Sequence, residues 1–291
     1  MRLFHDASYR FIQARRKAYV VSGIVLTAGV IFMIANVLNT GSWQNYGVDF
    51  TGGSLIQIQV YENLSAADLR DALSGSDEIT RFGEESEFVV RAPVAEDGSI
   101  GAVADEIERQ LAAAFGEEAF EVVRTEQVGA KVGGELQLKA LYAILFSFLL
   151  TLIYLAIRFE LRFGMAAVIA TLHDIMITLG FLAVFRVEIA LPTVAAILTI
   201  LGYSLNDTIV VFDRIRENMH KKGARKRDPV DLVNQSINET LPRTVLTSVT
   251  TLLVVLTLLL AGGEIIKGFA IALLIGVLIG CLLYTSDAAD E

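Results

Sequence analysis

Residues 18 to 38 have the sequence AYVVSGIVLTAGVIFMIANVL, a stretch without a charged side chain. About 20 mostly apolar residues in a helix are enough to cross the hydrocarbon core of a bilayer, so this stretch predicts a membrane-spanning helix. Arg15, Arg16 and Lys17 come directly before it. Because Lys and Arg gather on the cytoplasmic side of membrane helices, we expect residues 1–17 to be a cytoplasmic N-terminal segment.

Five further apolar runs predict that the chain crosses the membrane repeatedly. They are Leu138–Ile157, Gly164–Phe185, Leu191–Phe212, Val245–Ala261 and Gly268–Tyr284. Hydrophobic residues make up 54% of the chain and the mean hydropathy is +0.55, values that soluble domains of this length seldom reach. The expected fold class is an α-helical polytopic membrane protein with six transmembrane helices, one at residues 18–38 and five in a domain at residues 138–284.

Charged residues are segregated along the chain, and this predicts its orientation. Between residues 47 and 135 there are 19 acidic and 6 basic residues. Basic segments precede the first span, separate the second from the third, and fill residues 213–242 between the fourth and fifth. With six spans, all of these basic segments lie on one side, which the positive-inside rule makes cytoplasmic. We therefore expect a cytoplasmic loop at 213–242 and a periplasmic domain at 39–137.

The expected periplasmic domain shows alternating strand and helix patterns. The predicted strands are 54–61, 79–82, 87–92 and 120–124, and the predicted helices are 65–74 and 99–115. Ser65 followed three residues later by Asp68 is a helix-start signal related to the capping box. The order β-α-β-β-α-β favours a ferredoxin-like α+β domain between the first two membrane helices.

Several polar side chains fall at the predicted spans, where ionisable groups are costly and commonly functional. His173 and Asp174 lie near the middle of the third span. Asn206 and Asp207 lie toward the cytoplasmic end of the fourth, and Arg243 precedes the fifth. A proton relay needs at least a carboxylate that can gain and lose a proton and a fixed cation near it. The carboxylates and the histidine could instead be structural hydrogen-bonding groups, and the arginine a surface anchor.

Other patterns argue against several kinds of chemistry. The chain has no GxxxxGK[ST] phosphate loop, no serine in a GxSxG setting, and no zinc-binding spacing among its three histidines and Cys281. We expect no cofactor, no metal and no enzymatic activity, so the energy would come from a gradient or another subunit. The basic segment after the fourth span could bind nucleic acid or lipid headgroups, but orientation explains its charge, and we expect no nucleic-acid partner. Asp213 and Arg214 at its start are expected to be a solvated cap.

Four sequence blocks together carry a family resemblance. The first is Gly47-Val48-Asp49-Phe50-Thr51-Gly52-Gly53, whose paired glycines indicate a turn leading into the first strand. The others are Leu172-His173-Asp174, then Leu201-Gly202-Tyr203-Ser204-Leu205-Asn206-Asp207-Thr208 continuing to Phe212-Asp213-Arg214-Ile215-Arg216-Glu217, and finally Thr240-Leu241-Pro242-Arg243-Thr244 with Thr247-Ser248. In this order and spacing they resemble, over nearly the whole chain, SecF of the SecD/SecF family in the resistance-nodulation-division superfamily.

The resemblance implies a role in bacterial protein export. Members of this family pair with SecD, assist the SecYEG channel together with YajC, and use the proton motive force to move exported unfolded polypeptide. They lie in the lipid of the bacterial cytoplasmic (inner) membrane. The resemblance also implies that Asp207 and Arg243 belong to the proton path, with Asp174, His173 and Asn206 as further relay candidates. It makes Gly47, Asp49, Phe50, Gly52 and Gly53 the family motif after the first helix.

Two other functions and one feature of the end of the chain stay open. The chain could be half of a small-molecule or lipid transporter with the same six-span layout, although its outer domain is small for a drug-binding funnel. It could also be a scaffold whose polar membrane residues only hold helices together. Residues 285–291 carry an acidic tail at an expected cytoplasmic exit, where the family's last span normally continues. We expect this tail to be a truncated or foreign end.

Overall fold

The computed structural model describes residues 8–61, 64–73, 78–81, 86–92, 102–158, 161–221, 227–263 and 266–287. The chain forms two compact units. The first unit combines Met1–Asn45 with Ala143–Glu291, and the second unit, inserted in the sequence between them, is Tyr46–Tyr142. The inserted unit begins and ends a few residues later than the domain expected at 39–137.

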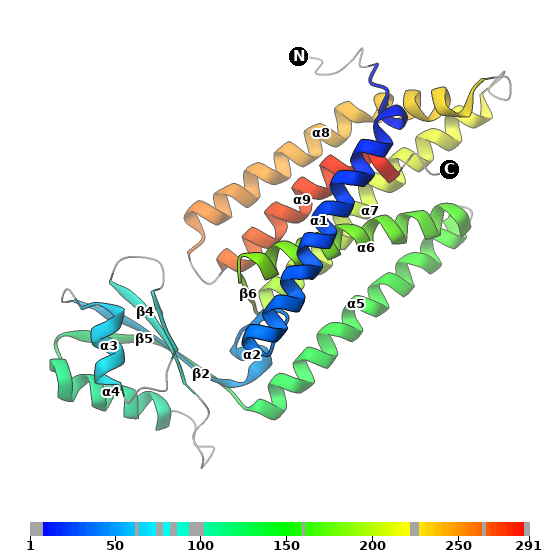
Figure 1. Cartoon of the computed structure of the whole chain (residues 1–291). Coiled ribbons are helices and arrows are strands. Elements are labelled where there is room, and N and C mark those ends of the chain that lie inside the picture. The colour runs from blue at the N-terminus through cyan, green and yellow to red at the C-terminus, as the bar shows by residue number, and fades with distance from the viewer. Residues whose placement is uncertain are drawn as a thin grey trace. The chain divides into compact units, whose positions relative to one another are not determined.

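Long helices make up the first unit (Figure 1). They are α1 Phe11–Thr40, α5 Ala130–Arg158, α6 Leu161–Val184, α7 Leu191–His220, α8 Pro229–Ala261 and α9 Lys267–Asp287, with a short strand β6 at Glu188–Ile189. The first turns of α5 belong to the second unit. In the described part of the chain, five of these helices are long and apolar enough to cross a membrane, and Lys267–Gly280 of α9 is a shorter apolar helix. The chain is therefore a multi-pass membrane protein.

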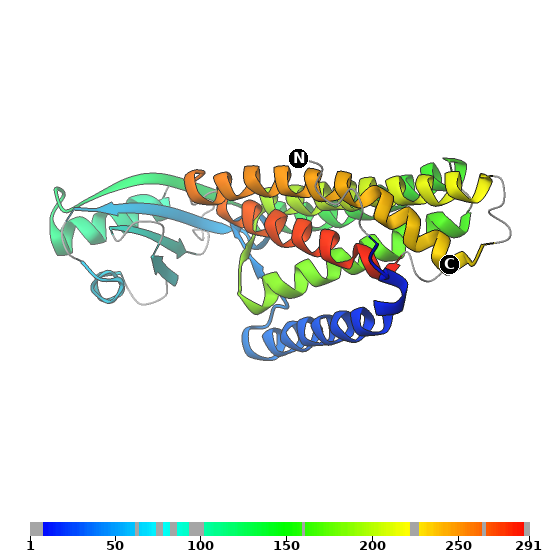
Figure 2. The same ribbon diagram turned by 90° about the horizontal axis from the view of Figure 1, so that it is seen from above.

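Close packing joins these helices into a bundle (Figures 1 and 2). α9 contacts α1, α6, α7 and α8. Where α1 meets α6, Gly29 and Gly180 face each other so closely that a Cβ on either would lie about 3 Å from the other's Cα. Small residues of this kind allow membrane helices to approach. At the far end of the same contact, Asn36 donates a hydrogen bond to the carbonyl of Ala183.

Three helices of the bundle, α1, α5 and α8, expose most of their apolar surface. Only 6% of the most apolar stretch of α5 and 17% of those of α1 and α8 are buried, against 56% for α6. Exposed side chains along α5 include Leu145, Phe146 and Leu150. Apolar surface on this scale is stable in contact with lipid or another protein, which fits helices that lie in a bilayer.

The helices extend beyond the spans expected from hydropathy. α7 continues to His220 and α8 already begins at Pro229, so most of the segment expected as a cytoplasmic loop is helical. Asp228 before Pro229 is a helix-start signal in the sequence that our prediction overlooked. In the structure Asp228 caps α8 by accepting a hydrogen bond from the backbone N–H of Val230. A helix of 30 residues, such as α7, is about 45 Å long and exceeds the hydrocarbon thickness of about 30 Å. Hydropathy marks the apolar part of a helix and not its ends.

The second unit is a four-stranded antiparallel sheet with two helices. Its elements are β2 Gly53–Val60, α3 Ala66–Ala72, β3 Glu78–Arg81, β4 Glu87–Ala92, α4 Ala102–Phe115 and β5 Phe120–Val128. The strand order across the sheet is β3-β4-β2-β5. The element order β-α-β-β-α-β is therefore as expected. The beginning of the predicted helix at 99–115 and the last residue of the predicted strand at 79–82 lie outside the described residues.

One face of this sheet forms the core. Alternating residues of β2, Ile56 and Ile58, pack with Phe88 of β4, Leu69 of α3 and Leu111 of α4. This period-two pattern is what the sequence of the first strand predicted. The capping box at the start of α3 is also present, since Ser65 and Asp68 exchange hydrogen bonds.

Between α1 and the sheet lie two short elements, β1 Asn45–Tyr46 and α2 Val48–Thr51. We expected only a turn here, and the structure forms one helical turn before the glycines. Gly52 and Gly53 then adopt φ values of 73° and 121°, conformations that residues with a Cβ rarely take. The paired glycines thus lead the chain out of α2 and into β2.

Candidate functional site

A chain of polar contacts crosses the bundle through Asp174. Oδ2 of Asp174 accepts a hydrogen bond of 2.7 Å from the hydroxyl of Ser204 on α7. Its Oδ1 lies 3.2 Å from Nδ1 of His173, and Nε2 of His173 is hydrogen-bonded to the hydroxyl of Ser22 on α1. Three helices therefore meet at one carboxylate and one imidazole.

The surroundings of Asp174 leave its carboxylate almost without exposure. Only 4% of the residue is exposed, and Oδ2 would lie 3.5 Å from a Cβ placed on Gly280, so α9 packs directly against this oxygen. Thr171 and Thr178 are fully buried beside it and bond to carbonyls of their own helix. A polar group at this depth is stable only with internal partners, and Ser204 and His173 supply them.

Asp207 and Arg243 form the second part of the site. Asp207 is 5% exposed and lies three residues after Ser204 on α7. Arg243 on α8 is exposed, and it is near enough for its positive charge to favour the ionised carboxylate of Asp207. Burial penalises a charged carboxylate and a nearby cation favours it, so the charge state of Asp207 is sensitive to how α7 and α8 pack.

Asn206 lies on a different side of α7 from Asp207. Successive residues of a helix point about 100° apart, and Asn206 is exposed on α7 while Asp207 is buried. The structure adds polar residues that we did not predict, namely Ser22, Ser204 and the pair Tyr203–Ser248. The hydroxyl of Tyr203 donates a hydrogen bond of 3.1 Å to Ser248 across α7 and α8. Small hydroxyl residues within the apolar runs could have indicated these contacts in the sequence, because such residues form hydrogen bonds between membrane helices.

In the second unit, the glycine motif packs against the start of α5. Phe50 is buried, and its carbonyl accepts a hydrogen bond of 3.0 Å from Nε2 of Gln137. A Cβ on Gly133 would lie 2.8 Å from that carbonyl oxygen and 2.9 Å from the amide nitrogen of Gly52. Sequence reasoning missed Gly133 and Gln137, which fix α5 to the motif.

Within the described ranges, no three His, Cys, Asp or Glu side chains are grouped so as to hold a metal ion. The polar side chains of the bundle contact one another directly, from one helix to the next. This arrangement can bind, hold and pass a proton, because it contains an imidazole, two buried carboxylates and hydroxyl groups.

Comparison with known proteins decides the family. The profile described as "Protein export membrane protein SecD/SecF, C-terminal" matches residues 107–286, and the profile described as "SecD/SecF GG Motif" matches residues 45–60. The chain belongs to the SecD/SecF family. The first match covers all five relay candidates, and the second covers the glycine motif.

Relatives of this SecD/SecF family member match over most of their length. It is 45% identical to "Protein translocase subunit SecF" of Desulfurispirillum indicum, with 93% of this chain and 86% of the relative covered. It is 39% identical to the subunit of the same name from Escherichia coli O157:H7, with 94% and 83% covered. Among solved structures it matches SecDF of Thermus, titled a translocon-associated membrane protein, with a TM-score of 0.85 and 35% identity. That match covers 99% of this chain and 39% of the SecDF chain, so this chain spans well under half of SecDF.

Proposed function

We propose that this chain is a SecF-type subunit that uses the proton motive force, together with SecD, to promote protein export across the bacterial cytoplasmic membrane. The observation that carries the proposal is the buried carboxylate of Asp207 on α7 with the charge of Arg243 on α8 acting on it. Membership of the SecD/SecF family and the likeness to SecDF support the export part.

The proton step follows from electrostatics. When Asp207 is charged, it attracts Arg243 and draws α7 and α8 together. Protonation removes the negative charge and most of that attraction, and it leaves the cation to find another partner. Proton binding therefore biases the packing of the two helices, which is what coupling a gradient to movement requires.

The other relay candidates have distinct proposed parts. Asp174 and His173 would carry the proton through the interior, since they already contact each other and hydroxyl groups of α1 and α7. Asn206 would act from the exposed face of α7, where a helix of SecD completes the path. The glycine motif of Gly47, Asp49, Phe50, Gly52 and Gly53 would hold the outer domain to α5.

Membrane arrangement and partners are further parts of the proposal. We propose six spans, with α9 as the sixth, a cytoplasmic N-terminus, and a periplasmic second unit of the ferredoxin-like class; its strand order and two helices support that class. Its partners would be SecD, the SecYEG channel, YajC and the exported polypeptide, and the spans would contact lipid.

The test replaces Asp207 by Asn and measures gradient-dependent export in inverted membrane vesicles that contain the SecD complex. Asp213→Asn is the matched control, because Asp213 lies on the same helix but is exposed and paired at 3.6 Å with Arg158. Loss of the gradient-dependent part of export in Asp207→Asn, with export retained in Asp213→Asn, supports the proposal. Unaltered export in Asp207→Asn overturns it.

A further inference from the structure

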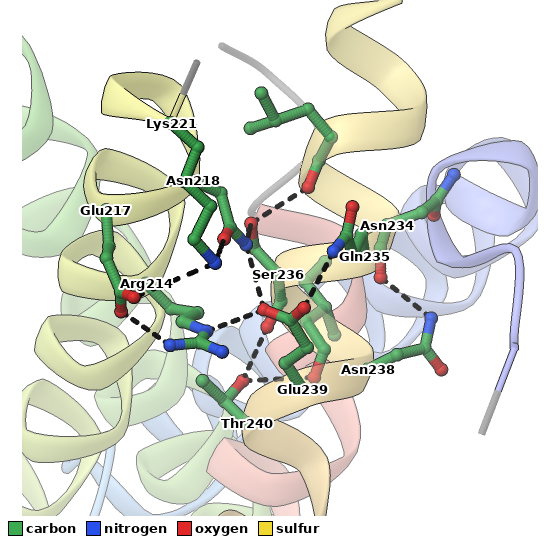
Figure 3. Close-up of polar contacts among 12 residues, drawn as sticks. Arg214, Glu217, Asn218, Lys221, Asn234, Gln235, Ser236, Asn238, Glu239 and Thr240 are labelled. Carbon is green, nitrogen blue, oxygen red and sulfur yellow. Dashed lines mark hydrogen bonds and ion pairs between the residues drawn. The ribbon is translucent and has the colours of Figure 1, made fainter. Parts of the chain in front are cut away.

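A polar junction joins α7 and α8 beyond the proton site, as Figure 3 shows. Nε of Arg214 on α7 donates a hydrogen bond of 2.6 Å to Oε2 of Glu239 on α8. The same oxygen accepts a bond of 2.9 Å from Nδ2 of Asn218, and the other oxygen accepts one of 2.7 Å from Gln235. One carboxylate thus gathers three donors, two of them from the neighbouring helix. Asp213 is exposed, as expected of a solvated cap, whereas Arg214 is half-buried and α7 continues past both residues.

The junction is buried at one end and open to solvent at the other. Asn218 and Ser236 are buried and hydrogen-bonded to each other at 2.9 Å. The side chains of Arg214 and Glu239 are 32% and 26% exposed. Hydrogen bonds to a charged group in such surroundings are stronger than neutral ones, and they fix geometry as well as contributing energy.

The same part of α8 is also fixed on its other side. Oδ1 of Asn234 accepts a hydrogen bond from the backbone N–H of Ile12, in the first turn of α1. Asn238 exchanges hydrogen bonds with the backbone N–H and carbonyl of Tyr9. The beginning of α8 is therefore held by α7 on one side and by the start of α1 on the other.

Pro242 separates this fixed part from the membrane part of α8. Proline lacks an N–H for the hydrogen bond to the carbonyl of residue 238, so a helix bends most easily at this point. Figure 2 shows that α8 changes direction along its length. Arg243 follows Pro242 directly, so it lies where the fixed part of α8 ends.

Helical spacing ties the junction to the proton site. On α7, Arg214 follows Asp207 by seven residues, which is two turns and about 10 Å on one face. On α8, Arg243 follows Glu239 by four residues, about one turn and 6 Å on one face. Each helix therefore carries one acidic and one basic residue in this region, in opposite order along the two helices: Asp207 and Arg214 on α7, Glu239 and Arg243 on α8.

We propose that Arg214 and Glu239 are positioning residues that set the distance between Arg243 and Asp207 during the proton step. This inference rests on the proposed function. Neither residue touches the proton; the pair locks the register of α7 and α8, so weakening it moves the cation relative to the carboxylate. Glu217 is the natural control, because its ion pairs in the described part of the chain, with Arg214 and Lys221, both lie on α7 or at its end.

The test compares Glu239→Gln with Glu217→Gln in the complex with SecD, in inverted membrane vesicles, across a range of pH. Glu239→Gln keeps the shape of the side chain and removes its charge. We expect it to lower gradient-dependent export roughly threefold to tenfold and to displace the pH profile of export, while SecD still copurifies. Glu217→Gln is expected to keep both the rate and the pH profile. Arg214→Lys, which keeps the charge but loses the planar fork, should give a smaller loss and a displacement of the same direction.

Each alternative outcome has a definite meaning. Equal behaviour of Glu239→Gln and Glu217→Gln overturns the inference, and so does a lower export rate with an unchanged pH profile, which would make the pair merely structural. If Glu239→Gln does not accumulate in the membrane, Glu239→Asp replaces it, and a wild-type pH profile of that variant overturns the inference. Asp207→Asn in the same vesicles separates the two claims. If Asp207→Asn exports normally, the proposed function fails. If Asp207→Asn loses export while Glu239→Gln behaves like the wild type, only the positioning role fails.

Discussion

The hydroxyl of Ser204 on α7 donates a hydrogen bond of 2.7 Å to the carboxylate of Asp174 on α6. Both residues are buried, and the other oxygen of Asp174 lies against His173. The bond therefore joins two helices of the bundle and provides a donor for an almost completely buried carboxylate.

Replacing Ser204 by Ala is expected to destabilise the bundle by about 1–3 kcal/mol, because it leaves a buried acceptor without its donor. Thr199→Ala is the control, since Thr199 is exposed on the same helix and bonds only to the carbonyl of Ala195. Thermal unfolding of the purified complex in detergent measures both. Equal unfolding temperatures for the two variants would contradict the importance of the Ser204–Asp174 bond.

The neighbouring glycines of α5 make a matched pair for testing the motif. Gly133→Ala places a Cβ within 3 Å of the backbone of Phe50 and Gly52, whereas Gly134 has nothing within 4 Å of its Cβ position. We expect Gly133→Ala to destabilise the second unit by about 1–3 kcal/mol. Gly134→Ala should be neutral or slightly stabilising, because alanine favours a helix. Urea unfolding followed by protease sensitivity of residues 46–142 reports the difference, and identical curves would rule out close packing at Gly133.

A second glycine pair tests the contact between α1 and α6. Gly29→Ala should push these helices apart, since its Cβ would lie 2.9 Å from Cα of Gly180. The control is Gly23→Ala on the same helix, which has open space around its Cβ. The expected result is a lower unfolding temperature and weaker gradient-dependent export for Gly29→Ala alone, because the His173–Ser22 contact belongs to the same helix pair. Wild-type values for Gly29→Ala would mean that the helices do not meet there.

The capping box of α3 predicts a pH effect outside the membrane. Hydrogen bonds from the side chain and the backbone of Ser65 lower the pKa of Asp68 below its usual value. A pKa lowered by folding stabilises the helix at neutral pH, and that contribution disappears as the pH falls through the folded-state pKa, below about pH 4. Hydrogen exchange of residues 66–72, corrected for the intrinsic rate, should increase in acid relative to residues 102–115. In Asp68→Asn it should be faster already at neutral pH and change less in acid; a variant as protected as the wild type would contradict the capping account.

Local patterns predicted the second unit well because its elements follow from neighbouring residues. The expected strand at 87–92 has those bounds in the structure, and the cap at Ser65 is present. The last strand is longer than expected, running to Val128, because Thr125 to Val128 pair with Gly53 to Ile56 of β2. That polar stretch carries no strand signal of its own, and only pairing with a distant strand makes it one.

The residues of the candidate site could be singled out from the sequence, but their contacts could not. Charged residues in apolar runs marked Asp174 and Asp207, since such residues are costly in a membrane. Which residue faces which neighbour depends on the rotation and register of each helix, and hydropathy does not encode them. For this reason Asn206 is exposed beside the buried Asp207, and the contributions of Ser22 and Ser204 emerge only from the packing of α1 and α7 on α6.

The central claim is that Asp207 changes its protonation state during the working cycle. Infrared difference spectroscopy on the complex with SecD in vesicles, recorded before and after a proton gradient is imposed, observes carboxyl protonation directly. We predict a carboxyl band that changes with the gradient, is missing in Asp207→Asn and remains in Asp213→Asn. A spectrum without such a band, or a band that persists in Asp207→Asn, would contradict the account.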